Sequence, residues 1–188
     1  MQICLVRHGE TEWNSLGKLQ GREDIPLNNA GIFQMKKTAD YLKKFTWEVI
    51  ISSPLKRAKN SADIIAKEIN KISIFEEYDF IERDYGKASG MTLEERKLNF
   101  PDGKWPDIEA SEQLQNRTVK ALFKYINEYE GKNIIIVSHG ASINSILAYL
   151  SKDEIGTGKT ILKNACMTLL ERIGNELEII YYNKTTDE

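Results

Sequence analysis

Continuous apolar runs, without alternation between apolar and polar positions, mark the strands that this sequence predicts. The runs are rich in β-branched residues and lie at 2–7, 48–52, 72–75, 133–138, near 162–171 and at 176–182. Runs of this kind are typical of strands that are covered on both faces, as in a parallel sheet. The last two runs flank Gly174-Asn175, a pair that favours a hairpin turn and predicts an antiparallel pairing at one edge.

Helical periodicity falls between these runs. Asn28 or Asn29 can cap a first helix, and Pro54 suits the first turn of a second. Ser111 can cap a third helix, and a fourth follows His139. Strands that alternate with helices predict an α/β fold. We expect three α/β/α layers, in which a mostly parallel central sheet has one antiparallel edge strand.

Two segments fall outside this alternation. Residues 76–110 lack a clear period and contain Pro101, Pro106 and several glycines, so we expect an irregular region that caps the functional site. Residues 183–188 are polar and are expected to form a loose tail. The chain of 188 residues fits one domain, which we place at 1–182.

The composition changes the picture mainly by exclusion. The formal net charge is −2 and no long basic run occurs, which excludes the footprint of a nucleic-acid-binding protein. The longest apolar runs are far shorter than a membrane span, and no secretory signal precedes the first strand. Cys4 and Cys166 fall in predicted strands, where buried reduced thiols are expected. We therefore expect a cytoplasmic protein with no membrane partner.

Cationic and imidazole side chains stand at the carboxyl ends of the predicted strands. The first strand ends in Arg7 and His8, and the strand at 133–138 is followed by His139. Arg57 comes about one helical turn after the strand at 48–52. His8 and His139 are the two histidines of the chain, and each precedes a glycine. Because ligands of open α/β sheets bind beyond the carboxyl ends of the strands, we expect an anion site there.

Such a cluster can bind and transfer a phosphate group. The arginine fork matches phosphate oxygens, and an imidazole is a competent nucleophile toward phosphorus. The second histidine and the arginines can donate hydrogen bonds to the charge that spreads over the phosphate. A carboxyl group must then protonate the leaving oxygen, and spacing alone leaves several candidates open. These candidates are Glu76, Glu77, Asp79, Glu82 and Asp84.

Two other interpretations are weaker. Two histidines can bind a metal, but an arginine near each of them disfavours a divalent cation, and no further Cys or His lies at ligand spacing. The segment GTGKT at 156–160 is similar to part of a phosphate-binding loop. That loop needs a further glycine where this chain has Asp153, and it must open a helix, whereas this segment leads into a predicted strand. A solvated turn is the prediction for 156–160.

Five motifs in order give the chain a family resemblance. They are LVRHGETEWN at 5–14, LQGREDIPLNNAG at 19–31, SSPLKRAKNSA at 52–62, IERDYG at 81–86 and IIIVSHGASINSIL at 134–147. This series resembles the histidine phosphatase superfamily, whose fold is the phosphoglycerate mutase-like one. The resemblance runs over nearly the whole chain.

The resemblance implies a role for each matching residue. His8 would be the nucleophile that becomes phosphohistidine, while Arg7, Arg57 and His139 would form the phosphate pocket. Glu82 would be the proton donor and acceptor. Substrate-contacting positions would be Asn14, Gln20, Gly21 and the backbone at Gly140 and Ala141. The resemblance implies neither a metal nor another cofactor.

The departures from the family's mutases favour a phosphatase. Between residues 87 and 110 the cations are scattered, and the paired arginines of the mutases are not found. Gln20 stands where mutases usually have a small residue, and the chain is shorter than they are. We expect a cofactor-independent phosphatase that acts on a small phosphate ester. The alternatives are a 2,3-bisphosphoglycerate-dependent phosphoglycerate mutase and a non-catalytic phospholigand-binding module, and a homodimer is left open.

Overall fold

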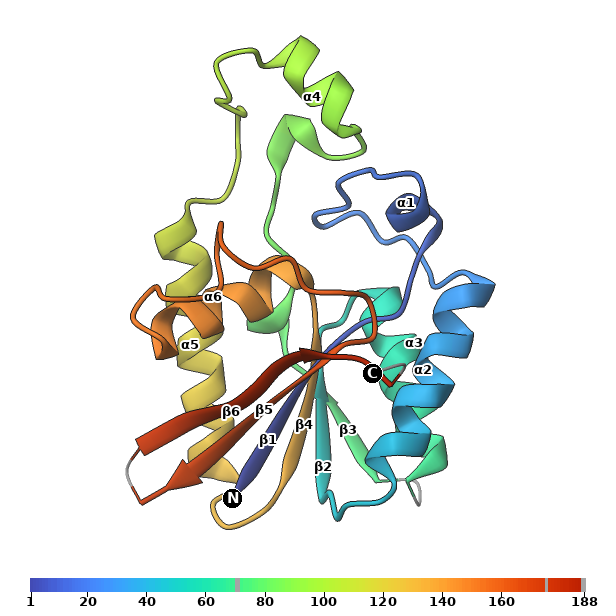
Figure 1. Ribbon diagram of the computed structural model, residues 1–188, viewed down its shortest axis with the longest axis vertical. Helices are drawn as coiled ribbons and strands as arrows, with labels where there is room; N and C mark the ends of the chain where they lie inside the picture. The colour runs from blue at the N-terminus through green and yellow to red at the C-terminus, as the bar shows by residue number, and fades with distance from the viewer. Residues whose placement is uncertain (70–71, 175, 187–188) are drawn as a thin grey trace.

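The computed structural model describes residues 1–69, 72–174 and 176–186, and within them six strands form one mixed sheet. The strands are β1 Gln2–Arg7, β2 Val49–Ser52, β3 Ser73–Glu76, β4 Ile134–Ser138, β5 Met167–Ile173 and β6 Glu176–Lys184. Their spatial order is β3-β2-β4-β1-β5-β6. The first four pair in parallel, whereas β5 is antiparallel to both β1 and β6 (Figure 1). The predicted mostly parallel sheet with an antiparallel edge is confirmed.

Helices cover both faces of the sheet (Figure 1). The longer ones are α2 Asn29–Leu42, α3 Lys56–Glu68, α5 Ser111–Glu128 and α6 Gly140–Leu150. The shorter ones are α1 Glu12–Ser15, α4 Leu93–Asn99 and the 3₁₀ turns η1 Tyr78–Phe80 and η2 Gly86–Ala88. Helices α2 and α3 share one hydrophobic cluster with the sheet, and α5 and α6 share the other. The expected three α/β/α layers are therefore present.

The central strands explain why the sequence shows no alternation. Within β1, Ile3 and Leu5 face the cluster of α5 and α6, whereas Cys4 and Val6 face the cluster of α2 and α3. All four side chains are fully buried, because a strand with helices on both faces needs apolar residues at every position. Both cysteines are free thiols and buried, as expected, although Cys166 lies just before β5.

Three predicted boundaries differ from the structure. The strand expected near 162–171 begins only at Met167, because the preceding residues form an irregular link bonded to the end of β1. In that link, the Ala165 N–H donates to the His8 carbonyl. Helix α3 begins at Lys56 rather than at Ser53-Pro54, because the Ser53 N–H still pairs with β4. Strand β6 continues to Lys184, two residues beyond the expected end of the domain at 182.

The remaining expectations concern loops. Segment 76–110 is not wholly irregular, since it contains η1, η2 and α4 (Figure 1). Within the hairpin turn Gly174-Asn175, Asn175 lies outside the described residues, as do positions 187 and 188 of the expected tail.

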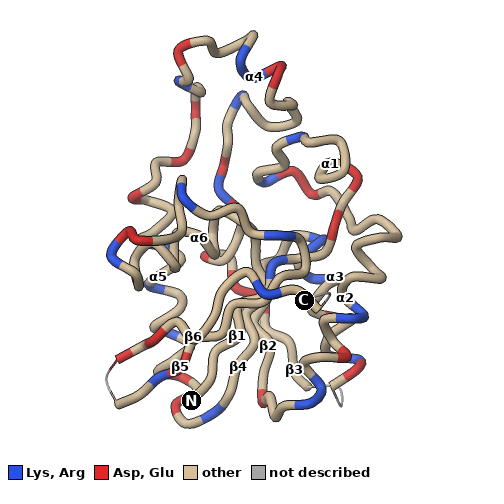
Figure 2. The backbone as a smooth tube through the Cα atoms, in the orientation of Figure 1, with Lys and Arg blue, Asp and Glu red and all other residues tan. Residues whose placement is uncertain are grey.

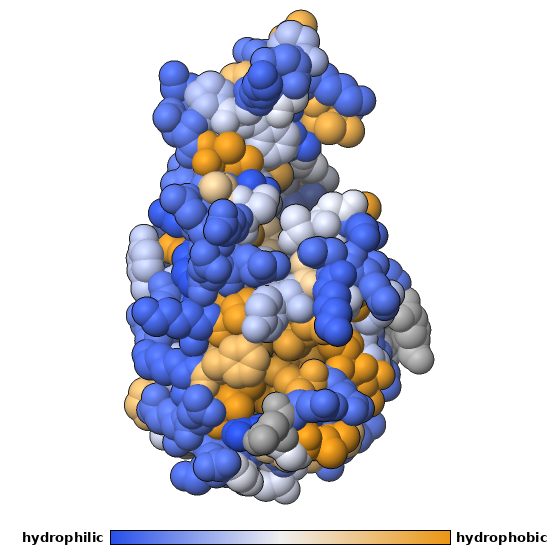
Figure 3. Space-filling view, turned by 90° about the vertical axis from the view of Figure 1, so that its left-hand side faces the viewer, coloured by the Kyte–Doolittle hydropathy of each residue, from blue (hydrophilic) through white to orange (hydrophobic). Residues whose placement is uncertain are grey.

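The surface carries mixed charge, and the face that includes β6 has an apolar region. Figure 2 shows Lys and Arg positions interspersed with Asp and Glu positions over the chain, in keeping with the small net charge. Figure 3 views the molecule from the β6 side and shows hydrophobic surface over its lower half. Edge strand β6 leaves Ile180 and Tyr182 exposed. Within residues 1–69, 72–174 and 176–186, no helix combines the length and the apolar character needed to cross a bilayer.

Candidate active site

Strand register brings the predicted cations and histidines to one edge of the sheet. Arg7 lies opposite Ser138 in the β1–β4 ladder, and Ser52 lies opposite Val137 in the β2–β4 ladder. The residues that follow these ends, His8 and His139, place their ring centroids 5.2 Å apart. Parallel pairing thus brings together segments that are far apart in the sequence.

The tautomer of His8 is set by its own backbone. The Nδ1 atom lies 2.6 Å from the carbonyl oxygen of Gly9, and a carbonyl can only accept, so Nδ1 carries the proton. The Nε2 atom then presents its lone pair, which accepts a hydrogen bond from Arg57 Nε at 3.3 Å. Burial, Arg57 and Arg7 hold the pKa of His8 well below 6.5. The ring is therefore neutral at pH 7, as a nucleophile must be.

His139 is the buried N-cap residue of α6. Its Nε2 atom lies 2.7 Å from the hydroxyl of Ser53, while its Nδ1 atom is buried with no hydrogen-bond partner among the described residues. When the Ser53 hydroxyl donates to Nε2, the proton resides on Nδ1 and is available to a ligand. Burial, with Arg57, His8 and Arg7 nearby, holds the pKa of His139 well below 6.5, so this ring is also neutral at pH 7.

Arg57 reaches the site from the first turn of α3 and is almost completely buried. Its Nη1 atom donates to the Glu23 carbonyl at 2.6 Å, and its Nη2 atom donates to the Gly21 carbonyl at 2.7 Å. Gly21 has a φ of +53°, a left-handed conformation that suits glycine. Burial lowers the pKa of Arg57 to about 10, so the guanidinium remains charged at pH 7.

Arg7, which is half-buried at the end of β1, supplies a second guanidinium. Its Nη1 atom donates to the carbonyl of Leu162, and its Nε atom is buried with no partner among the described residues. Burial lowers the pKa of Arg7, with opposing contributions from Cys166 and Glu82. Gly140 lies against this guanidinium, because a Cβ at that position would meet Arg7 Nε at 3.5 Å. The unpaired donors Arg7 Nε and His139 Nδ1 suit an anionic ligand.

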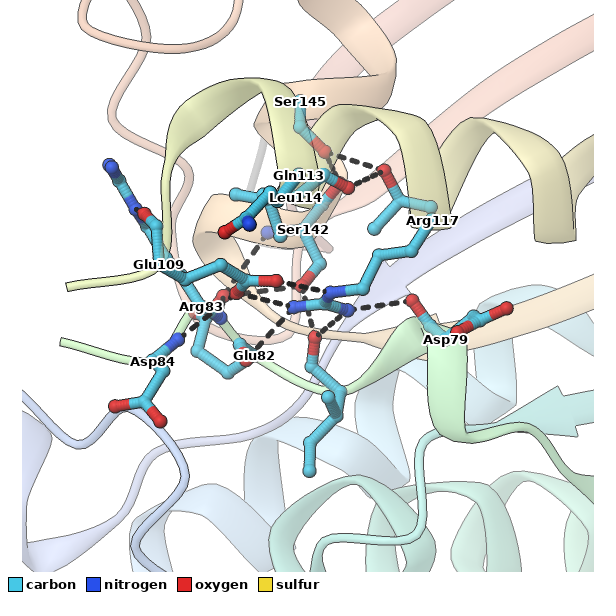
Figure 4. A network of polar contacts seen from close by, with 12 residues as sticks. Asp79, Glu82, Arg83, Asp84, Glu109, Gln113, Leu114, Arg117, Ser142 and Ser145 are labelled. Carbon is cyan, nitrogen blue, oxygen red and sulfur yellow. Dashed lines mark hydrogen bonds and ion pairs between the residues drawn. The ribbon is translucent and has the colours of Figure 1, made fainter. Parts of the chain in front are cut away.

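Glu82 extends its carboxylate toward the N-terminus of α6 (Figure 4). Oε1 accepts from the Arg83 N–H at 2.9 Å, the Ser142 N–H at 3.1 Å and the Ser142 hydroxyl at 3.3 Å. Oε2 has a single contact, which is the Ala141 N–H at 3.2 Å. One carboxylate oxygen is thus held firmly and the other is lightly bound.

Three of the other four candidate carboxylates are engaged elsewhere. Glu76 pairs with Lys59 at 2.6 Å, and Glu77 pairs with Lys124 at 2.6 Å. Asp84 lies 3.6 Å from Arg22. Of the five candidates, Glu82 is the one that lines the cavity over the histidines within the described residues.

That cavity has a volume of about 530 Å³, which suits a small ligand. Every predicted site residue except His139 lines it, and these residues are Arg7, His8, Asn14, Gln20, Gly21, Arg57, Glu82, Gly140 and Ala141. Asn14 is held by Asn164, whose amide donates to Asn14 Oδ1 at 3.1 Å. Gln20 is buried, and its Oε1 atom has no partner among the described residues. The structure therefore brings the predicted residues together.

Several residues of the site were missed by the sequence reasoning. Ser61 accepts from the Gly9 N–H at 3.3 Å, and Asn164 donates to the carbonyls of His8 and Gly9 at 3.2 and 3.3 Å. Nothing local in the sequence marks Asn164, because it acts across 156 residues. The cavity is also lined by Lys18, Arg83, Tyr85, Arg96 and Asn144.

The segment at 156–160 forms the expected turn between α6 and β5. It is not remote from the site, however, because Thr157 and Gly158 line the cavity. Within the described ranges, no cluster of three or more His, Cys, Asp or Glu residues is arranged to hold a metal ion. Of the described residues, the charged ones that line the cavity are five cations, Arg7, Lys18, Arg57, Arg83 and Arg96, and one carboxylate, Glu82, and this excess of positive charge suits an anion.

The fold and this site define a phosphate-handling enzyme: arginines surround two neutral imidazoles at the carboxyl ends of parallel strands. The sequence profile of the histidine phosphatase superfamily (branch 1) matches residues 3–185, and the chain belongs to that family. Its similarity to phosphatases of the family makes the chain a phosphatase.

Individual relatives support this assignment. PhoE of Bacillus subtilis (strain 168), described as an uncharacterized phosphatase, is 44% identical over 181 residues, or 96% of this chain and 93% of PhoE. A phosphoserine phosphatase of Entamoeba histolytica, solved with 3-phosphoglyceric acid, is 30% identical with a TM-score of 0.85, over 98% of this chain and 97% of that one. Bacillus stearothermophilus YhfR has a TM-score of 0.92 over 100% and 99% of the chains at 22% identity, which supports the fold alone.

Proposed function

We propose that the protein hydrolyses a small phosphomonoester without a cofactor, through a phosphohistidine at His8. The observation that carries the proposal is the His8 tautomer. Its Nδ1 proton lies against the Gly9 carbonyl at 2.6 Å, so Nε2 carries the lone pair of a ring that lines the cavity. Arg57 Nε donates to this lone pair at 3.3 Å, and a bound phosphate would take over that donor. A buried neutral imidazole with this orientation is ready to attack phosphorus.

The first step forms one bond and breaks another. His8 Nε2 attacks phosphorus while the ester P–O bond breaks, and the leaving oxygen takes a proton from the Glu82 carboxyl. Arg7, Arg57 and His139 bind the remaining phosphate oxygens and stabilise their charge. Oε2 of Glu82 is suited to carry the proton, because it has one contact whereas Oε1 has three.

The second step restores the enzyme. Water attacks phosphorus and gives a proton to the Glu82 carboxylate, and the P–N bond breaks. Inorganic phosphate leaves, and His8 returns to its neutral state. The same two groups therefore serve both half-reactions, and neither half requires an ion.

The further cations that line the cavity favour a substrate with a second acidic group. Lys18 and Arg96 line the cavity in addition to the phosphate-binding arginines. The phosphoserine phosphatase of Entamoeba histolytica has a carboxylate in its substrate, and 3-phosphoglyceric acid has one as well. We therefore propose a carboxylate-bearing alkyl phosphate as the substrate class.

A mutase is the less favoured alternative. Within 87–110, all of which the structure describes, Arg96 is the one cation that lines the cavity, whereas Lys87, Lys97 and Lys104 do not. Lys18 and Arg83 also line the cavity, so a second acidic group would meet cations that are separate in the sequence rather than paired arginines. An assay of phosphoglycerate interconversion, primed with 2,3-bisphosphoglycerate, distinguishes the two activities.

The experiment is a screen followed by trapping. Phosphate release is measured in EDTA over alkyl phosphates that include O-phosphoserine and 3-phosphoglycerate, and over p-nitrophenyl phosphate. A short pulse of labelled substrate, stopped with alkali, should leave acid-labile label on the wild-type protein and none on His8→Ala. Acid-stable label, or activity that needs an added divalent ion, would contradict the proposal. A protein that binds phosphate but releases none is instead a non-catalytic binding module.

A further inference from the structure

Arg117 of α5 lies beneath the segment that carries Glu82 (Figure 4). All five of its N–H donors are used. Nε and Nη2 bind the two carboxylate oxygens of Glu109 at 2.7 and 2.9 Å. Nη1 donates to the carbonyls of Asp79 and Ile81, both at 2.7 Å, and Nη2 donates to the carbonyl of Glu82 at 3.1 Å. One guanidinium therefore binds three carbonyls within four residues.

These carbonyls belong to backbone that no strand supports. Residues 81–85 connect η1 to η2 without regular structure. The carbonyl of Ile81 also accepts from the Ser142 hydroxyl at 2.7 Å, and the intervening Phe80 carbonyl accepts from the Ser138 hydroxyl at 2.8 Å. Side chains thus fix the main chain at Glu82, and Arg117 is the charged donor among them. Charge-assisted bonds of this kind are the strong ones.

Glu109 links this contact to the opposite end of the same segment. Its carboxylate accepts from the Asp84 N–H at 3.2 Å and lies 3.5 Å from Arg22. Burial raises the pKa of Glu109, but Arg117, the Asp84 N–H and Arg22 together outweigh that effect, so the pKa lies below its usual range. The Arg117–Glu109 pair therefore joins the backbone of residue 82 to residue 109, just before α5. The intervening segment, which contains α4, projects above the sheet layers (Figure 1).

We propose that Arg117 is a positioning residue for the proton transfer, which it serves by holding the main chain of Glu82. This inference rests on the proposed role of Glu82 as the acid. The Glu82 carboxyl must meet the leaving oxygen within hydrogen-bond reach when the P–O bond breaks. A shift of its backbone by a fraction of an ångström misplaces the proton, although His8 and the arginines stay in place.

The readout is the dependence of the rate on the leaving group. A phenolate leaves without protonation, whereas an alkoxide does not. We expect Arg117→Met to lower kcat tenfold to a hundredfold more for O-phosphoserine, or for 3-phosphoglycerate if it is the faster alkyl ester, than for p-nitrophenyl phosphate. The KM for p-nitrophenyl phosphate should stay unchanged. A purely structural role would lower the two rates alike.

Three further variants distinguish a role of Arg117 in proton transfer from a role in the fold alone. Lys120→Met makes the same kind of change at an exposed position of α5 and should leave both rates unchanged. Arg117→Lys keeps the charge and three donors, so it should give a smaller selective loss, and it is the variant to measure if Arg117→Met does not fold. In a Glu82→Gln background, Arg117→Lys should add no further selective loss, because the proton donor is already absent.

Different results would contradict the role of Arg117 and the role of Glu82. If Glu82→Gln itself loses both substrates alike, the assignment of the acid is wrong. If Glu82→Gln is selective but the Arg117 variants lower both rates equally, Arg117 serves the fold only and the inference is overturned.

Discussion

At the residue scale, the site contains polar atoms that the folded chain leaves without partners. Arg7 Nε, His139 Nδ1 and Gln20 Oε1 are buried and have no hydrogen bond among the described residues. Each unpaired buried group costs about 1–3 kcal/mol. Arg7 and Gln20 line the cavity, and His139 stands beside His8 below it. A bound phosphate ester offers oxygens to the two donors, which explains why they are kept.

We expect that lysine at position 57 cannot support the activity that Arg57 supports. Its guanidinium binds His8 Nε2 and the carbonyls of Gly21 and Glu23 at the same time, and an ammonium group cannot reproduce that geometry. We expect Arg57→Lys to lower kcat/KM for p-nitrophenyl phosphate by about 10²-fold to 10³-fold. Lys56→Ala, at the exposed neighbouring position, should stay within twofold of the wild type, and a similar loss there would contradict the assignment.

Glu82→Gln tests the proton donor itself. The amide keeps the shape of the side chain but cannot give up a proton to an alkoxide. We expect the variant to lose about 10²-fold to 10⁴-fold more activity on an alkyl phosphate than on p-nitrophenyl phosphate.

The neighbouring carboxylates provide the control for Glu82. Glu77→Gln removes the charge that pairs with Lys124 but keeps an oxygen that can accept from the Asp79 N–H, so it should affect both substrates little. A selective alkyl loss at Glu77, or equal losses on both substrates for Glu82→Gln, would mean that another group is the acid.

At the scale of elements, the start of α2 meets the turn after β1 through two glycines. A Cβ on Gly31 would lie 2.1 Å from the carbonyl oxygen of Glu10, and a Cβ on Gly9 would lie 2.5 Å from that of Gly31. Both contacts are with backbone, which cannot give way as a flexible side chain can. The close approach of these two elements therefore depends on the absence of side chains.

We expect Gly31→Ala to lower the free energy of unfolding by about 1–3 kcal/mol, measured by urea denaturation. Gly140→Ala is the matched control, since it also lies in the first turn of a helix. Its Cβ would meet Arg7 Nε at an ordinary 3.5 Å, so the free energy of unfolding should stay unchanged or rise slightly. If the two substitutions changed the free energy of unfolding equally, the close approach of α2 to the turn after β1 would not determine stability.

Much of the fold could be predicted because the central strands are continuous apolar runs and the long helices have a regular apolar period. Predicted strands at 2–7 and 133–138 match β1 and β4 to within one residue, since the four central positions of β1 and every position of β4 are buried. Leu162 misled the prediction of β5: it is buried, yet it lies in the irregular link before that strand. A buried position favours an apolar residue whether or not it lies in a strand. A strand also needs a neighbouring strand to pair with, and the sequence does not reveal that partner.

The site residues likewise fall into those that a local sequence pattern predicts and those that depend on distant contacts. His8, His139 and Arg57 could be found because they follow strand ends, and parallel strands end at a common edge. Glu82 could be chosen among nearby carboxylates only through the family resemblance. Arg117 and Asn164 could not be found, because their contacts join positions 36 and 156 residues away and leave no local pattern.

At the scale of the whole molecule, the net charge of −2 opposes an anionic substrate, so attraction must be local. The arginines that provide it lie beside the histidines, and this arrangement keeps both imidazoles neutral. Function and stability are therefore linked through the same two rings.

This link predicts how stability depends on pH. In the unfolded chain both histidines take up a proton as the pH falls below 6.5, whereas in the folded protein burial, Arg57 and Arg7 hold their pKa values well below that value. The unfolded state therefore binds more protons, and the free energy of unfolding falls with pH from 6.5 downward, by about 1.4 kcal/mol per histidine for each pH unit. Urea denaturation at pH 7.5, 6.5 and 5.5 should show a flat limb and then a loss of up to about 3 kcal/mol. Each of His8→Asn and His139→Asn should remove about half of that loss, and an unchanged loss in the double variant would assign it to other groups.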